Sequence, residues 1–151
     1  MKGKEHEIIN ILLLPPVLTI IPAEGTFPFS IGYIIGTFFI SPDIDIPHSR
    51  SSKRWNILKI FWYPLWMVVG HRGVLHIPIV GTFVKLIYLL LIFFPIYNLL
   101  ESLFPVGLYI KHIDEIKLFY FTLGIIIADI LHILLDVMES KVKRLVRKLF
   151  F

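Results

Sequence analysis

The sequence has 151 residues, which is enough for one domain and too short for two ordinary ones. Hydrophobic residues make up 56% of the chain and charged residues 17%, and the mean hydropathy is +0.79. Soluble domains are nearer to about 45–50% apolar and about 25% charged, and so small a domain cannot bury the surplus. We therefore predict a single membrane domain over residues 1–151 that exposes apolar surface to lipid.

The absence of cysteine excludes disulfide scaffolds, thiolate zinc sites, iron–sulfur clusters and cysteine nucleophiles. Lys and Arg number 15 and Asp and Glu number 11, which gives a net charge of +4. In a membrane protein this excess indicates cytoplasmic loops and membrane lipids with anionic headgroups as partners, and not nucleic acid. The sequence identifies no protein partner.

Apolar stretches over about residues 8–21, 27–41, 77–100 and 116–137 are candidates for membrane-spanning helices. Each span needs roughly 17–25 residues. In the second stretch, Gly32 and Gly36 have the four-residue spacing that suits close helix contact. Residues 56–70 are too few to span easily and carry Trp62 and Trp66, so we predict an interfacial or re-entrant helix there.

Basic residues set the predicted orientation. They precede the first span, follow the second and follow the fourth: Lys2, Lys4, Arg50, Lys53, Arg54, Lys59, Lys141, Lys143, Arg144, Arg147 and Lys148. By the positive-inside rule these three regions are cytoplasmic, and with four spans they all lie on one side. The predicted fold is therefore an all-α bundle of four transmembrane helices, a multi-pass integral membrane protein with both termini inside.

The basic tail over residues 139–151 has its own pattern. Its apolar residues recur at helical spacing opposite the positive charges. This pattern predicts a C-terminal amphipathic helix that lies on an anionic membrane surface. A positive-inside signal with no further role explains the same charges equally well.

Charged and imidazole side chains near the spans are functional candidates, because they are costly inside a membrane. Under the predicted topology the cytoplasmic end of the bundle collects His6, Asp43, Asp45, His71, His76, Asp129, His132 and Asp136. The topology was inferred from Lys and Arg alone, so this convergence is an independent observation. It predicts a metal centre that faces the cytoplasm.

Spacing along the chain supports the metal centre. Asp129, His132 and Asp136 lie three and four residues apart, which places them on one helical face. Asp43 and Asp45 point the same way if the chain is extended after its proline. Both carboxylates of that pair are then available to one ion.

The ligand types favour particular metals. Gly73 permits a turn between His71 and His76, so both rings can face one centre. Imidazole and carboxylate ligands without thiolate suit Zn²⁺ first, with Mn²⁺ or Fe²⁺ as alternatives. The candidates outnumber the ligands of one tetrahedral zinc, and two ions that share bridging carboxylates would use them better. We expect a cofactor of one or two divalent ions.

Each residue alone has a simpler interpretation. Any one of the aspartates could cap a helix or pair with Arg72, and Asp136 could also pair with Lys141. His6 could be a solvated N-terminal residue. His48 lies in a polar loop beside the acidic pair and is a weaker candidate. The ensemble is harder to explain without a metal than any member is.

Basic residues near the predicted centre are candidates for substrate binding. Lys85 lies about two turns into the third span, where an ammonium group needs a partner. Snorkelling to the interface is the alternative for this residue. We predict that Lys85 and Arg72, with Arg54 as a further candidate, hold an anionic group such as a lipid phosphate.

Four segments carry a resemblance to a known family: Ser41-Pro42-Asp43-Ile44-Asp45, Arg54-Trp55-Asn56-Ile57-Leu58, Gly70-His71-Arg72-Gly73-Val74-Leu75-His76 and Asp129-Ile130-Leu131-His132-Ile133-Leu134-Leu135-Asp136. From His6 to about Glu139 the chain resembles an uncharacterised metal-binding membrane protein family of prokaryotes, which is similar to the inner-membrane metal-dependent hydrolases. Their shared pattern is an N-terminal His, Pro-Asp-Ile-Asp, His-Arg-Gly-x-x-His and a late His-x-x-x-Asp. The resemblance implies a prokaryotic inner membrane and metal-ligand roles for His6, Asp43, Asp45, His71, His76, His132 and Asp136, with Asp129 as a looser match.

Such hydrolases are sometimes grouped with zinc-dependent phospholipase C, so phosphoester chemistry leads the functional hypothesis. We expect a membrane-embedded hydrolase of a phosphoester or other ester of a lipid at the cytoplasmic leaflet. Asp45 or Asp129 would act as general base, and Arg72 or Lys85 would stabilise charge on the substrate. The alternative is a non-catalytic metal-binding protein, with a sensor, metal-handling or scaffold role. A third hypothesis is an assembly partner that recruits a soluble protein through its basic tail.

Overall fold

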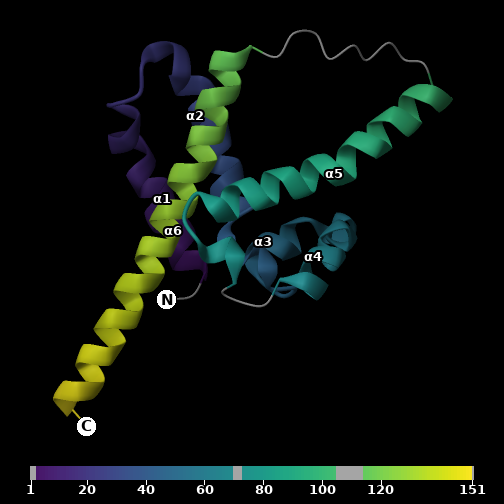
Figure 1. Ribbon diagram of the computed structural model, residues 1–151. Helices are drawn as coiled ribbons and strands as arrows, with labels where there is room; N and C mark the ends of the chain where they lie inside the picture. The colour runs from purple at the N-terminus through teal and green to yellow at the C-terminus, as the bar shows by residue number, and fades with distance from the viewer. Residues whose placement is uncertain (1–2, 70–72, 105–113, 151) are drawn as a thin grey trace.

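The computed structural model describes residues 3–69, 73–104 and 114–150, and in these ranges the chain forms helices and no strand (Figure 1). The long helices are α1 (Gly3–Leu18), α2 (Ala23–Phe38), α5 (Val80–Leu103) and α6 (Glu115–Phe150). Between α2 and α5 the chain forms the short segments η1 (Pro42–Asp45), α3 (Arg50–Arg54), η2 (Asn56–Trp62), α4 (Tyr63–Val68) and η3 (Val74–His76). The all-α class is confirmed.

Helices α2 and α6 pack with their backbones in contact, because glycines lie at the crossing. A Cβ atom on Gly32 would lie 1.9 Å from the carbonyl oxygen of Phe121, and one on Gly124 would lie 2.2 Å from that of Phe29. A Cβ on Gly36 would meet α6 at 3.1 Å. The predicted role of the two α2 glycines in close helix contact is confirmed.

Helix α1 completes a three-helix unit with these two. The Asn10 side-chain amide donates to the Ala128 carbonyl at 3.2 Å, and the Tyr33 hydroxyl donates to the Asn10 carbonyl at 2.8 Å. The buried side chains of Phe29, Tyr33 and Ala128 form the core between the helices. This unit fixes the start of α1, which carries His6, against the middle of α6.

A second core holds the short segments together. It consists of the buried side chains of Ile40, Ile44, Trp62, Leu65, Leu75 and Ile125. The Trp66 indole donates to the Ile44 carbonyl at 2.7 Å, so the segment after α3 is tied to η1. Residues 56–68 are helical, as predicted for the interfacial segment, and are divided between η2 and α4.

Within the described ranges, two helices are long and apolar enough to cross a membrane. They are α5 over Val80–Leu103 and α6 over Glu115–Leu149, with mean hydropathies of 2.1 and 2.2. Helices α1 and α2 have 16 residues each, which is about 24 Å of helix and less than the roughly 30 Å of a bilayer core. Length and composition therefore support two spans and do not support the four that we predicted.

Two further features of the predicted architecture differ in the structure. The buried residues of α5 are Gly81, Thr82 and Lys85 in its first turns, and beyond them α5 diverges from α6 (Figure 1). The described helices therefore do not form a four-membered bundle. The basic tail is no separate helix either: α6 runs unbroken to residue 150, because the chain after Gly124 contains neither proline nor glycine.

Candidate metal centre

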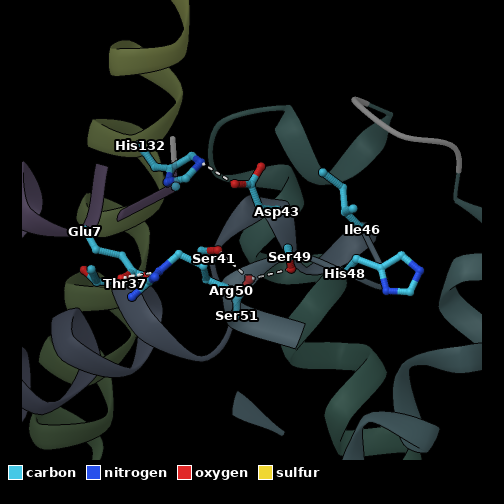
Figure 2. A pocket seen from close by; sticks show the side chains of 11 residues that line it. Glu7, Thr37, Ser41, Asp43, Ile46, His48, Ser49, Arg50, Ser51 and His132 are labelled. Atoms are coloured by element: carbon cyan, nitrogen blue, oxygen red, sulfur yellow. Dashed lines mark hydrogen bonds and ion pairs between the residues drawn. The ribbon is translucent and has the colours of Figure 1, made fainter. Parts of the chain in front are cut away.

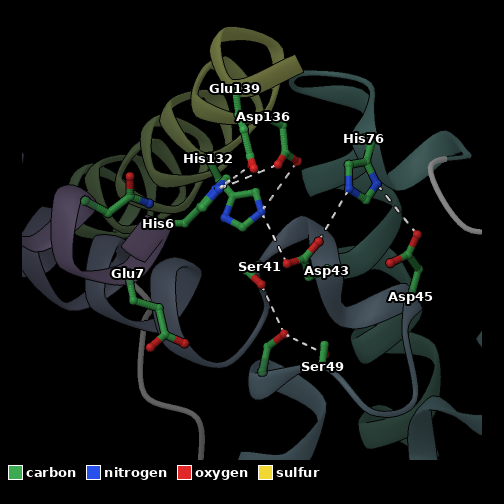
Figure 3. A network of polar contacts seen from close by, with 12 residues as sticks. His6, Glu7, Ser41, Asp43, Asp45, Ser49, His76, His132, Asp136 and Glu139 are labelled. Carbon is green, nitrogen blue, oxygen red and sulfur yellow. Dashed lines mark hydrogen bonds and ion pairs between the residues drawn. The ribbon is translucent and has the colours of Figure 1, made fainter. Parts of the chain in front are cut away.

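Acidic and imidazole side chains from four segments of the chain converge where α1, α6 and the short segments meet (Figure 3). They are His6 of α1, Asp43 and Asp45 of η1, His76 of η3, and His132 and Asp136 of α6. Within the described residues, their ligand atoms fall into two groups that could each hold a metal ion. All six residues are among the ligands predicted from the sequence.

The first group, which we call the α6 group, comprises His6, His132 and Asp136. Ligand atoms of the three residues all lie within 4.8 Å of one another. The Asp136 carboxylate lies 3.7 Å from His6 Nε2 and 3.9 Å from His132 Nε2. Glu139 Oε2 lies 3.9 Å from His6 Nε2 and is a further donor that the sequence analysis missed.

The second group, which we call the η1 group, comprises Asp43, Asp45 and His76, again with ligand atoms within 4.8 Å of one another. Asp43 Oδ1 lies 3.7 Å from His76 Nε2, and Asp45 Oδ2 lies 3.6 Å from His76 Nδ1. The two carboxylates therefore approach the imidazole from its two nitrogens.

The local structure of the η1 group differs from our expectation of extended chain after Pro42. Pro42 occupies the first turn of a 3-10 helix, a position that needs no backbone N–H donor. In such a helix, residues two apart point in different directions. Asp43 and Asp45 can therefore meet different atoms of His76, where extended chain would have aimed them at one point.

Asp43 connects the two groups. Its Oδ2 atom lies 3.5 Å from His132 Nε2 of the α6 group, while its Oδ1 atom faces His76. One carboxylate thus presents an oxygen to each group, as a bridging ligand does in a two-metal site. Its side chain is 27% exposed, whereas the His132 side chain is 7% exposed.

The unsatisfied polar atoms of the α6 group fit a cation. His6 Nδ1 and His132 Nε2 are buried and make no hydrogen bond among the described residues, and of the two it is His132 Nε2 that faces the Asp43 and Asp136 carboxylates. A buried donor or acceptor without a partner costs about 1–3 kcal/mol, and metal coordination is one way to satisfy a ring nitrogen. The imidazole and carboxylate donors are those that divalent transition metals take.

The ionisation of the site follows from its neighbours. Burial, and then the nearby His132, lower the pKa of His6 below its ordinary value, which favours the neutral ring that binds metal. Burial alone would raise the pKa of Asp43, but the nearby imidazoles of His132 and His76 outweigh it and hold that pKa well below its usual range. Burial opposes protonation of His76, yet Asp43 and Asp45 together raise its pKa.

Asp129 and Lys85 lie together, outside both groups. Lys85 Nζ lies 2.7 Å from Asp129 Oδ2 and donates to the Ile40 carbonyl at 2.6 Å. Thr82 donates to the same Asp129 oxygen. The Lys85 and Asp129 side chains are 0% and 2% exposed. The structure thus pairs the predicted ligand with the predicted substrate-binding lysine, and Lys85 does not snorkel.

Three other residues were predicted to act at the site: His71, Arg72 and Arg54. His71 and Arg72 lie outside the described residues. Arg54 is bonded to Glu7, with Nη1 at 2.6 Å from Oε1 and Nη2 at 2.9 Å from Oε2. Glu7 also accepts from Arg50 at 3.0 Å. Glu7 follows His6 directly and ties the start of α1 to α3, a role that was not predicted from the sequence.

A pocket of about 240 Å³ opens beside Asp43 and His132 (Figure 2). Hydroxyl groups line one part of it: Ser41 Oγ donates to Ser51 Oγ at 3.0 Å, and Ser49 Oγ lies 3.1 Å from Ser51 Oγ. His48 also lines this pocket, and it belongs to neither metal group. The centre therefore has an opening on one side.

Comparisons with known proteins identify the family of the chain. An "Uncharacterized protein" of Aquifex aeolicus (strain VF5) is 42% identical over 141 aligned residues, which cover 83% of this chain and 99% of the relative. No solved structure matches the chain significantly. The model of the family described as "Uncharacterized metal-binding protein (DUF2227)" matches residues 1–146. The chain therefore belongs to this DUF2227 family of metal-binding proteins.

Proposed function

We propose that the protein is a membrane-embedded hydrolase that uses a dinuclear His/Asp metal centre, with Zn²⁺ as the first choice of metal. The observation that carries this proposal is the Asp43 carboxylate, which faces His132 with one oxygen and His76 with the other. Two ions bridged in this way form a common arrangement for hydrolysis of phosphoesters. A phosphoester or another ester of a lipid is therefore the proposed substrate.

The chain's own residues would divide the work between the two groups. Because Asp43 is shared, the α6 group offers four residues as ligands and the η1 group offers three. A four-coordinate ion in the η1 group would therefore keep a position open for water or substrate. When bound, the ions would supply a water of lowered pKa and Lewis-acid stabilisation of charge. Asp45 would accept the proton of that water if an oxygen of its carboxylate stays off the metal. Asp129, which is held by Lys85, has no part in this step.

The membrane arrangement is part of the proposal. Helices α1 and α2 pack along the apolar first half of α6, as the contacts of Asn10 with Ala128 and of Gly32 with Phe121 require. If α6 crosses the bilayer there, α1 and α2 lie in it too. We propose that all four long helices enter the inner membrane of a prokaryote, and that both termini and the metal centre face the cytoplasm.

A non-catalytic metal-binding role is the second candidate, and one observation favours it. The six residues come from four separate segments, and half of them (His6, Asp45 and His132) are buried, so an ion here would also fasten α1, η1, η3 and α6 together. A structural site of this kind is closed by protein ligands, whereas a catalytic site keeps an open position.

Metal content and hydrolysis, measured on the same preparation, test the proposal. The full chain is purified in detergent without chelator, its metals are counted by mass spectrometry, and synthetic lipid phosphoesters are screened as substrates. We expect about two metal ions per chain and a hydrolysis that stops with chelator and returns with Zn²⁺. One tightly held ion without hydrolysis would support the structural role, and a metal-free chain would overturn both.

A further inference from the structure

A second cavity, of about 330 Å³, opens next to the metal centre and shares no lining residue with the pocket of Figure 2. We call it the α6 cleft. Its lining includes His76 and Asp136, one residue from each metal group, and Lys141 and Arg144. The cleft thus joins the metal centre to a pair of basic side chains.

The cleft follows one face of α6. Arg144 follows Asp136 by eight positions, about 12 Å of helix. The cleft residues on α6 recur at the three- and four-residue spacing of a single face. Ile133 and Val137 supply an apolar stretch on that face. A ligand in the cleft would therefore meet metal ligands, apolar side chains and cations together.

The two cations are available to a ligand. Lys141 and Arg144 are exposed and form no ion pair with any residue that the structure describes. Lys143, between them in sequence, is instead paired with Glu139. Arginine and lysine side chains beside a reaction centre bind phosphate oxygens through charge-assisted hydrogen bonds.

The position of the pair along α6 points to the source of the phosphate. No Lys or Arg occurs in α6 from residue 118 to residue 140, and Lys141 is the first basic residue after this apolar stretch. In a helix that crosses a bilayer, this transition lies at the level of the lipid headgroups. An anionic headgroup at this depth would reach the cleft without leaving the membrane surface.

We propose that the α6 cleft binds the phosphate group of an anionic lipid phosphoester, with Lys141 and Arg144 as the residues that determine specificity. This inference rests on the proposed hydrolase function and names its substrate class. It replaces Lys85, which is bonded inside the protein, as the group that holds the substrate anion.

Binding of defined phosphates tests the inference without relying on turnover. The probes are inorganic phosphate and dihexanoyl phosphatidic acid, titrated by calorimetry into the full chain in detergent. The test variant is Lys141→Gln/Arg144→Gln. The control, Arg147→Gln/Lys148→Gln, removes the same charge from the same tail at residues that do not line the cleft. Metal content is measured on every sample.

We expect dihexanoyl phosphatidic acid to bind the test variant at least about tenfold more weakly than the wild type, since two charge-assisted contacts are lost. The control variant should bind within about twofold of the wild type if the loss depends on contact and not on net charge. Metal content should be unchanged in both variants. Equal affinity of test variant and wild type would overturn the inference.

The remaining outcomes distinguish a lipid phosphate from free phosphate, and the proposal for the α6 cleft from the proposal of a hydrolase. Dihexanoyl phosphatidic acid binding more tightly than inorganic phosphate supports a lipid ligand, whereas equal binding of the two overturns the lipid part. Titration of Asp43→Ala, which lacks the carboxylate that faces both metal groups and does not line the cleft, isolates the cleft from the metal. Binding that still depends on Lys141 and Arg144 when this variant holds no metal supports the cleft even if the hydrolase proposal fails.

Discussion

The ammonium group of Lys85 lies 2.7 Å from the carboxylate of Asp129, and neither side chain is more than 2% exposed. The same ammonium donates to the carbonyl of Ile40, three residues before Asp43. Asp129 precedes His132 by three residues on α6. This buried ion pair therefore connects α5 to α6 and, through the Ile40 carbonyl, to the segment that leads into η1.

Removal of the ammonium should destabilise the fold and loosen the centre. Lys85→Met leaves the Asp129 carboxylate buried without its countercharge, a change that typically costs about 3–5 kcal/mol. We expect a clear fall in the thermal unfolding temperature in detergent and a partial loss of bound metal. The double variant Lys85→Met/Asp129→Leu should recover much of the stability, because it buries no unpaired charge. If the single variant unfolds at the wild-type temperature, the pair has no structural role.

Alanine variants of the aspartates should distinguish one metal ion from two. Asp136→Ala should remove the ion of the α6 group and Asp45→Ala that of the η1 group, so each variant should retain about half of the wild-type metal. Asp43→Ala should affect both, because its carboxylate faces both groups. Elemental analysis of the purified variants checks this. Complete loss in all three variants would indicate a single ion that all of them hold.

How well the site could be predicted from the sequence depended on how far apart in the chain the contacting residues lie. The placement of Lys and Arg and the spacing of the motifs predicted that the ligands lie at one end of the molecule. The structure brings six of them together there, from His6 to Asp136. Neither signal specifies partners that are far apart in sequence. The pairing of Lys85 with Asp129 and the bonds from Glu7 to Arg54 are such long-range contacts, and the sequence analysis assigned Lys85 and Arg54 to substrate instead.

Replacement of a glycine at the α2–α6 crossing should disrupt the packing that places His6. A Cβ on Gly32 would lie 1.9 Å from a backbone oxygen of α6, so the helices must separate in Gly32→Ala. Overpacking of this kind typically costs about 1–3 kcal/mol. The control is Gly3→Ala, whose Cβ would meet its nearest neighbour at an ordinary 3.6 Å. Thermal unfolding of the two variants should show a large fall for the first and little change for the second.

The limits of composition explain why the architecture was only partly predictable. Hydropathy identified the apolar segments, and the spacing of Gly32 and Gly36 predicted a close helix contact, but the spacing did not specify α6 as the partner. The number of membrane spans, however, depends on the lengths of the helices, and α1 and α2 have only 16 residues each. The continuity of α6 through residues 139–150 follows from local helix propensity, but the amphipathic pattern of the tail alone is compatible with either a bend or a straight helix.

Acid should remove the stabilisation that Glu7 provides. Burial would raise the pKa of this carboxyl, but hydrogen bonds and charge from Arg54 and Arg50 outweigh it and lower the pKa below the ordinary 4.5. A carboxyl with a lowered pKa in the folded state stabilises that state above its unfolded pKa, and the contribution is lost as the pH falls through the folded value. The stability difference between wild type and Glu7→Gln should therefore be constant near neutral pH and shrink below pH 4.5. A difference that persists unchanged in acid would contradict the role of the charge.

Chelation should destabilise the folded protein, and it should do so only by removing the ions of the metal centre. A metal that binds only the folded chain stabilises it by about 4 kcal/mol when its free concentration is a thousand times its dissociation constant. Removal of the ions with EDTA should therefore lower the unfolding temperature of the wild type, and added Zn²⁺ should restore it. Asp43→Ala removes the carboxylate shared by both groups. This variant should unfold at the lower temperature without any treatment, and neither EDTA nor Zn²⁺ should change its unfolding temperature. A wild-type protein that unfolds at the same temperature with and without EDTA would show that its His and Asp side chains form a polar network that holds no metal.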